Sequence, residues 1–235
     1  MHYLRGIGEL YSYFLLLLPE IIPNLNQSVS IQVTNASKKF GKEWIFKQID
    51  LTISQGEKIV ILGLNGSGKS TLLQALTGYL NLNSGKVSYL NNTTPIEDSK
   101  QYQLISLASP YLELIEDYTL REQIEHVAVY KPFLSDLKIE DIISLSGLSA
   151  HRDKYIKLFS SGMKQRLKLT LAILANCPIL FLDEPTTNLD ATVVKWYQQL
   201  INDYAMTKTI VVCSNSIKEE YEFCNKVIQM EDFKK

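Results

Sequence analysis

Apolar and polar residues alternate in two segments of the chain, 30–35 and 44–53. The alternation predicts two strands that each bury one face, joined by a turn at 40–42. Three later runs are apolar without interruption, which predicts strands buried on both faces, as in a parallel sheet. These runs are 58–62, 179–182 and 209–213.

Two shorter strands and two helices extend the pattern. Short apolar stretches predict strands at 87–90 and 104–107, on either side of a polar loop at 91–100. The spacing of apolar residues predicts helices at 161–174 and 191–204. Strands and helices therefore alternate along much of the chain, which is typical of an α/β fold.

Residues 119–156 have helical spacing instead of strand spacing. Their apolar residues fall on shared helix faces: Leu120, Ile124 and Val127 on one, and Leu137, Ile142 and Leu145 on another. We therefore expect a helical insertion in the α/β core, at about 112–158.

A glycine-rich loop follows the run 58–62 and precedes a helical pattern. From Gly63 to Thr71 it matches the phosphate-binding pattern G-x-x-x-x-G-K-[ST]. Glycines let backbone N–H groups approach phosphate oxygens, and the helix N-terminus favours the same anion. Lys69 would add a charge at the β- and γ-phosphates, and the Ser70 hydroxyl suits Mg²⁺. An ordinary Gly/Ser turn is the alternative, but the flanking strand and helix favour nucleotide binding. The candidate binding residues here are Gly63, Asn65, Gly66, Ser67, Gly68, Lys69, Ser70 and Thr71.

Two acidic residues, Asp183 and Glu184, end the apolar run 179–182. In P-loop enzymes a carboxylate at this place holds Mg²⁺ through water, so Asp183 is a candidate metal ligand. Glu184 could orient and polarise an attacking water. Alone, the pair would read as solvated acids at a strand end; after a P-loop, it indicates phosphate chemistry.

Composition excludes some classes of protein. Hydrophobic residues make up 46% of the chain, enough for a substantial core, and the net charge of −1 gives no general attraction to nucleic acid. The cysteines have no metal-ligand spacing, and their odd number among apolar neighbours favours reduced thiols, while the histidines lie far apart. These residues are Cys177, Cys213 and Cys224, and His2, His126 and His151.

Residues 1–29 differ in character from the rest. The run 11–18 is apolar but is interrupted by Pro19, and a membrane-spanning helix needs about 20 apolar residues. A signal peptide matches its hydrophobicity, yet Glu9 and the lack of a small-x-small cleavage site argue against one. Two readings stay open: a partner-docking segment, or a disordered leader ahead of a domain spanning 30–235.

Motifs further along the chain carry a specific resemblance to a known family. Phe-Ser-Ser-Gly-Met-Lys-Gln-Arg at 159–166 resembles the L-S-G-G-Q signature of the ATP-binding cassette (ABC) family. The segment 185–190, Pro-Thr-Thr-Asn-Leu-Asp, resembles the family's D-loop, and Phe40 matches the aromatic residue that stacks on adenine. The resemblance covers about 31–230 and implies a nucleotide-binding subunit of an ABC transporter.

The resemblance also implies an architecture and further site residues. It implies an α/β fold in which a P-loop NTPase core carries an antiparallel β subdomain and the helical insertion. Two such cassettes pair head to tail around two ATP molecules, so Ser160, Gly162 and Asp190 would face nucleotide bound by the other subunit. Ser160 also suits the N-cap of a helix starting at Ser161.

The sequence departs from the family pattern at four positions. Ser109 stands where the family has a glutamine, and it would touch Mg²⁺ only through water. Asn215 stands at the switch histidine; an amide can donate to the γ-phosphate but cannot exchange a proton near neutrality. Ser161 and Met163 replace Gly and Gln of the signature. These changes leave ATP binding intact and predict slow hydrolysis.

The function expected is an ATP-binding and ATP-hydrolysing subunit, with Glu184 and Asn215 as catalytic residues. It would use ATP and Mg²⁺, act as a homodimer or paired cassette without nucleic acid, and drive a separate membrane permease. Its location would then be cytoplasmic, peripheral on the inner face of the membrane. In the family, the partner's coupling helix docks at the region that corresponds to 111–133. The rivals are a soluble ABC ATPase without a permease and a nucleotide-gated binding module with very slow hydrolysis.

Overall fold

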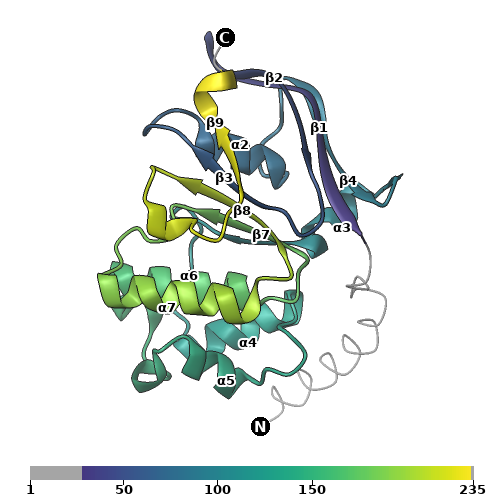
Figure 1. Ribbon diagram of the computed structural model, residues 1–235. Helices are drawn as coiled ribbons and strands as arrows, with labels where there is room; N and C mark the ends of the chain where they lie inside the picture. Colours follow the sequence, from purple (N-terminus) through teal and green to yellow (C-terminus); the bar gives the residue numbers. More distant parts are fainter. Residues whose placement is uncertain (1–27, 234–235) are drawn as a thin grey trace.

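A computed structural model describes residues 28–233 of the chain, which form two sheets and a layer of helices (Figure 1). One sheet is antiparallel, in the order β2-β1-β4-β5, and the other is parallel, in the order β6-β7-β8-β3-β9. The antiparallel strands are β1 (Val29–Phe40), β2 (Glu43–Ile53), β4 (Ser84–Asn91) and β5 (Thr94–Pro95). The parallel strands are β6 (Ile105–Ala108), β7 (Ile179–Asp183), β8 (Thr209–Ser214), β3 (Lys58–Leu62) and β9 (Lys226–Gln229).

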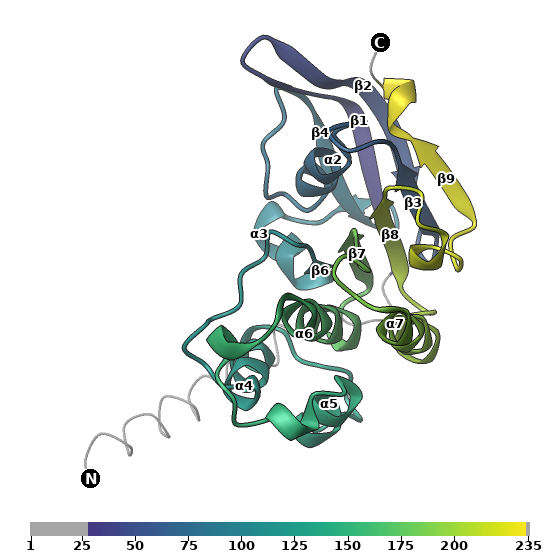
Figure 2. The same cartoon turned by 90° about the vertical axis from the view of Figure 1, so that its left-hand side faces the viewer.

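The helices separate into two groups. One helix, α2, lies between the two sheets, and four others cover the opposite side of the parallel sheet, where α6 packs on α7 and α4 on α5 (Figure 2). The bounds are α2 (Lys69–Leu76), α3 (Asp98–Gln101), α4 (Leu120–Tyr130), α5 (Ile139–Leu145), α6 (Ser161–Leu174) and α7 (Ala191–Tyr204). The expected architecture, a P-loop-type α/β core with an antiparallel β subdomain and inserted helices, is confirmed.

The parallel sheet separates two hydrophobic cores. Successive side chains of a strand point to opposite faces, so Leu180 packs toward the helices while Phe181 packs toward the antiparallel sheet. In β3 the same alternation sends Val60 to the helical side and Ile61 to the other. Truncating Phe181 to alanine would leave a cavity on one side and cost about 3–5 kcal/mol. Burial on both faces explains the uninterrupted apolar runs.

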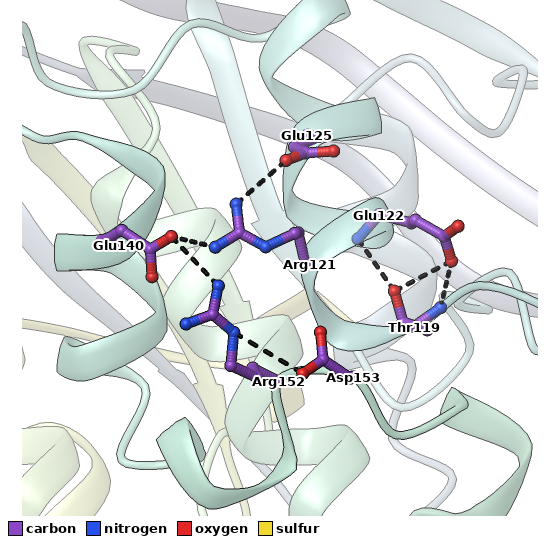
Figure 3. Close-up of polar contacts among 7 residues, drawn as sticks. All are labelled: Thr119, Arg121, Glu122, Glu125, Glu140, Arg152 and Asp153. Carbon is purple, nitrogen blue, oxygen red and sulfur yellow. Dashed lines mark hydrogen bonds and ion pairs between the residues drawn. The ribbon is translucent and has the colours of Figure 1, made fainter.

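Polar contacts join the helices of the helical insertion to one another (Figure 3). Arg121 of α4 pairs with Glu140 of α5, and with Glu125 at 3.2 Å. Arg152, from the loop after α5, reaches Glu140 at 3.3 Å and Asp153 at 3.7 Å. Exposed ion pairs contribute little net stability. We therefore attribute only the relative orientation of α4 and α5 to this network. The attachment of both helices to the core comes from their buried apolar residues.

The start of α4 is fixed by a capping box. The Thr119 hydroxyl accepts from the Glu122 amide at 3.3 Å, and a Glu122 carboxylate oxygen accepts from the Thr119 amide at 2.8 Å (Figure 3). These hydrogen bonds lower the pKa of Glu122. Both groups satisfy donors that a helix N-terminus leaves free, so α4 begins where the helical pattern predicts.

Most predicted elements are confirmed, with local exceptions. Helices at 161–174 and 191–204 match α6 and α7 at both ends. The polar loop expected at 91–100 contains two short elements that were not predicted, β5 and most of α3. The pattern also missed β9. Residues 1–27, including most of the expected leader, lie outside the described part. Within 28–233, no helix combines the length and the apolar character that crossing a membrane requires.

Candidate functional site

The glycine-rich loop joins the carboxyl end of β3 to the N-terminus of α2. Gly66 and Gly68 have φ values of 76° and 101°, in the left-handed region that glycine adopts without strain. Gly68 also faces Ile45 of β2 so closely that a Cβ there would clash. Both conformation and space therefore require glycine at position 68, where the backbone turns into the helix.

Lys69 points back into the loop and is only 4% exposed. Its Nζ donates to the carbonyls of Gly63 at 2.9 Å and Leu64 at 3.2 Å, and to Asn215 Oδ1 at 2.6 Å. The ammonium is thus held beside the free N–H groups that open α2, for which the described residues offer no side-chain cap. The Ser67 hydroxyl is buried and has no hydrogen-bond partner among residues 28–233. A cation, uncapped amides and an unpartnered hydroxyl suit a phosphate group.

Asp183 ends β7 directly beside this loop and is 1% exposed. Its two carboxylate oxygens accept from two serines, Ser70 Oγ at 3.1 Å and Ser109 Oγ at 3.4 Å. Burial raises the pKa of Asp183, and the hydrogen bond from Ser70 opposes this effect. A buried carboxylate between two hydroxyls offers the hard oxygen ligands that Mg²⁺ prefers. The three residues expected to hold the metal are therefore brought together, and they fit it.

Glu184 follows with a backbone φ of 45°, unusual for a residue with a side chain. Its amide donates to the Cys213 carbonyl of β8 at 2.9 Å. Its Oε1 accepts from Asn215 Nδ2 at 2.8 Å. Asn215 therefore links Lys69 to Glu184, and the parallel arrangement of β3, β7 and β8 places all three residues at one edge of the sheet.

The signature segment and the D-loop residues make local contacts in a single chain. The Ser160 hydroxyl accepts from the Met163 amide at 3.2 Å, which confirms Ser160 as the N-cap of α6. Asp190 caps α7 by accepting from the amides of Thr192 and Val193 at 2.9 and 3.0 Å. Gly162 lies against the Asn188 carbonyl, 3.0 Å from where a Cβ would stand. The described hydrogen bonds do not join Ser160 or Asp190 to the Lys69–Glu184 cluster.

Phe40, the candidate for base stacking, ends β1 and is 52% exposed. The ammonium of Lys38 lies 5.0 Å from the centre of its ring. An exposed aromatic ring suits stacking on a base.

Two buried polar residues near the Lys69–Glu184 cluster were not predicted from the sequence. Glu220 is fully buried and accepts two hydrogen bonds from Thr186. It lies in the charged run Lys218–Glu222, which in sequence looks like a solvated surface. Gln165 is also buried and donates to the Pro185 carbonyl at 3.0 Å. Gln165 stands inside the signature segment, the only sequence signal that could have pointed to it.

Comparison with known proteins agrees with this geometry. The model of the ABC transporter family matches residues 46–187. The chain is 30% identical over 200 residues to the uncharacterized ABC transporter ATP-binding protein YdbJ of Bacillus subtilis, covering 84% of this chain and 65% of that protein. It is 30% identical over 209 residues to the arginine transport ATP-binding protein ArtM of the same organism, covering 86% and 87%.

Two further similarities extend the comparison. The sulfate/thiosulfate import ATP-binding protein CysA of Synechococcus elongatus is 29% identical over 212 residues, covering 87% of this chain and 61% of that protein. The chain thus spans less than two thirds of YdbJ and CysA. The bacterial ABC transporter cassette MJ0796, solved as a dimer, superposes with a TM-score of 0.70 at 24% identity, covering 85% of this chain and 93% of that one. From the family match and the relatives, we conclude that the chain belongs to the ABC transporter family.

Proposed function

We propose that this protein binds ATP with Mg²⁺ at the glycine-rich loop and hydrolyses it there. The proposal rests on one observation, the meeting of Lys69, Asp183 and Glu184 at the carboxyl edge of the parallel sheet. Lys69 and the N-terminus of α2 would hold the β- and γ-phosphates, and Phe40 would stack on the adenine. These contacts position the γ-phosphate against Glu184.

The metal site follows from the same geometry. Ser70 and Asp183 would hold Mg²⁺, with Ser109 reaching it through water. The bound ion would neutralise charge on the β- and γ-phosphate oxygens. Burial raises the pKa of Asp183, and a bound cation would favour its charged form.

The chemical step would depend on Glu184. Its carboxylate would orient and polarise the water that attacks the γ-phosphate. Asn215 would donate its amide to the γ-phosphate, but it has no proton to exchange near neutrality. With Ser109 and Asn215 replacing longer or titratable groups, we propose that turnover is slow.

The working form would be a pair of cassettes, either a homodimer or a paired subunit. In it, the N-terminus of α6, with Ser160 and Gly162, would face the γ-phosphate bound by the opposite subunit, with Asp190 nearby. The Ser160 hydroxyl accepts from the Met163 amide, and Ser160 and Ser161 are exposed, so the positive dipole end of α6 lies at the surface of the chain. ATP would then join the pair, and hydrolysis would release it.

A separate membrane permease is the proposed partner. A groove of about 390 Å³ lies where the helical insertion, α6 and β6 meet, and it is lined mainly by apolar residues. Among them are Leu112, Leu114 and Val127 from the region 111–133, and Leu171 of α6. Tyr111, next to Leu112 in sequence, is 72% exposed, whereas Tyr118 packs partly into the core. The groove supports docking of a partner's helix, and ArtM and CysA, by name, serve transport. The protein would then act at the cytoplasmic face of the membrane.

A second candidate is a nucleotide-gated binding module that hydrolyses ATP very slowly, favoured by the amide at position 215. Phosphate release from ATP and Mg²⁺, compared between the native chain and Glu184→Gln, separates the two. Turnover that depends on Glu184 supports the ATPase; equal rates in both proteins would contradict it.

Isolation of the tagged chain from detergent-treated cells, with identification of co-purifying proteins, separates a transporter subunit from a soluble ATPase. An integral membrane protein in stoichiometric amount is expected.

A further inference from the structure

Glu184 has a backbone conformation that needs support. Its φ of 45° lies in the left-handed region, where a Cβ crowds the backbone. Residues held in this way persist only when the surrounding structure fixes them. The segment after it, Pro185 to Thr187, provides two places where such support is applied.

The first support comes from Glu220. Its Oε1 accepts from the Thr186 amide at 3.1 Å and from the Thr186 hydroxyl at 2.7 Å. Glu220 is itself fixed, since its carbonyl accepts from the Tyr197 hydroxyl of α7 at 2.9 Å. Two residues beyond Glu184, the chain is therefore anchored to the loop that follows β8.

The second support comes from the helix of the signature segment. Gln165 Nε2 donates to the Pro185 carbonyl at 3.0 Å, and Gln165 is 5% exposed. Gln165 and Glu220 thus form hydrogen bonds with two consecutive residues, Pro185 and Thr186 respectively, from different elements. The Glu184 amide is bonded to Cys213, so the turn is fixed at both its ends.

Burying Glu220 is costly, and general packing does not account for it. The residue is 0% exposed, and its Oε2 has no hydrogen-bond partner among residues 28–233. A buried carboxyl costs free energy unless its hydrogen bonds repay it. Glu220 Oε1 accepts from the Thr186 amide and from the Thr186 hydroxyl, and Thr186 is itself 8% exposed. The buried Glu220 carboxyl therefore directs its Oε1 hydrogen bonds to the turn that carries Glu184.

We propose that Glu220 is a positioning residue for ATP hydrolysis, which holds Glu184 in its water-orienting conformation through Thr186, with Gln165 as the second anchor. The proposal rests on the proposed function, because it assigns a role relative to Glu184. Glu220 itself touches neither substrate nor metal. Its loss should therefore slow the chemical step and leave nucleotide binding, which depends on Lys69, unchanged.

The test compares Glu220→Met, which removes the acceptor, with Glu220→Gln, which retains an oxygen for Thr186. Misplacing a reacting group by about 1 Å can cost about 100-fold in rate. We expect Glu220→Met to lower kcat by about 10- to 100-fold with the Kd for ATP unchanged, and Glu220→Gln to keep most of the native kcat. The matched control is Glu219→Met, at the exposed neighbour, with native kinetics. Should Glu220→Met fail to fold, Thr186→Val, which removes the hydroxyl donor alone, serves in its place.

A double-mutant cycle separates positioning from general support of the fold. In a Glu184→Gln background, a residue that acts only through Glu184 has nothing left to position, so Glu220→Met should lower the residual rate less than about twofold. Equal losses in both backgrounds, a parallel loss of ATP affinity, or an unchanged kcat in Glu220→Met would overturn the proposal. Failure of the proposed function would look different, because the native chain itself would then show no Glu184-dependent hydrolysis of ATP.

Discussion

Asn215 donates from Nδ2 to Glu184 Oε1 at 2.8 Å while its Oδ1 accepts from the Lys69 ammonium at 2.6 Å. An ammonium only donates and a carboxylate only accepts, so these two neighbours dictate the orientation of the amide. One side chain thus connects the cation of the glycine-rich loop to the carboxylate proposed to orient water. Binding of ATP would draw Lys69 toward phosphate and leave the amide free to donate there.

This relationship predicts the effect of changing Asn215. Removing one donor aimed at developing charge typically costs about 100-fold in rate, and a neutral amide should supply part of that effect. We expect Asn215→Ala to lower the rate of phosphate release by about tenfold or more. Asn215→His, which adds a titratable donor, should raise it by a modest, severalfold amount.

Steady-state assays at saturating ATP and Mg²⁺ measure both variants. Their control is Ser216→Ala at the exposed neighbour, which should match the native rate. If Asn215→Ala were as fast as the native chain, Asn215 would be a structural residue only.

The second prediction concerns assembly. Glu184→Gln keeps the shape of the side chain and the proposed phosphate contacts but removes the carboxylate proposed to orient water. With ATP and Mg²⁺ present, the variant should accumulate as a dimer, with a mass about twice the monomer's 26.8 kDa by light scattering. The double variant Lys69→Ala, Glu184→Gln should stay monomeric, because it lacks the phosphate-binding cation. A monomeric Glu184→Gln that still hydrolyses ATP would rule out this role for Glu184.

The third prediction concerns a buried lysine far from the nucleotide. Lys208 Nζ donates to the carbonyls of Ile173 and Ala175 at 2.7 and 2.5 Å, at the C-terminal end of α6. Burial lowers the pKa of Lys208 from 10.5 to about 8, and the nearby Cys177 thiol opposes this effect. Between pH 8 and 10.5 the unfolded chain therefore binds more protons, and this group raises the free energy of unfolding by up to about 1.4 kcal/mol per pH unit.

Urea unfolding of the native chain and Lys208→Met, from pH 7.5 to 10, measures this effect. The free energy of unfolding of the native chain, minus that of the variant, should increase with pH. Lys218→Met, at an exposed lysine, should follow the native pH dependence. A native-minus-Lys208→Met difference that is flat across this range would show that the lysine is not perturbed.

Sequence predicted the parts of the site that depend on short stretches of chain. The loop from Gly63 to Thr71 is one contiguous pattern, and its glycines are required by the turn they form. The meeting of Asp183 with Ser70 followed from parallel strands, whose carboxyl ends share one edge. The link from Asn215 to Lys69 could not be foreseen, because it depends on two side-chain conformations across 146 positions of sequence.

Other features depend on tertiary packing that overrides the local sequence pattern. Glu220 is buried although its neighbours in sequence are charged, because the turn at Thr186 supplies its hydrogen bonds. β9 was missed because only Ile228 of its four residues is fully buried, so pairing with β3 creates the strand. The helices α6 and α7, by contrast, have long apolar faces and side-chain caps, and both ends could be predicted.

ATP binding at Lys69 is the claim on which the other roles depend. A calorimetric titration with ATP and Mg²⁺ of the native chain, Lys69→Ala and the exposed control Lys195→Ala measures it directly. A charged donor to phosphate contributes about 1.5–3 kcal/mol, so Lys69→Ala should weaken binding by about 10- to 150-fold while Lys195→Ala binds as the native chain does. Equal ATP affinity in the native chain and Lys69→Ala would contradict the assignment of the glycine-rich loop as the nucleotide site.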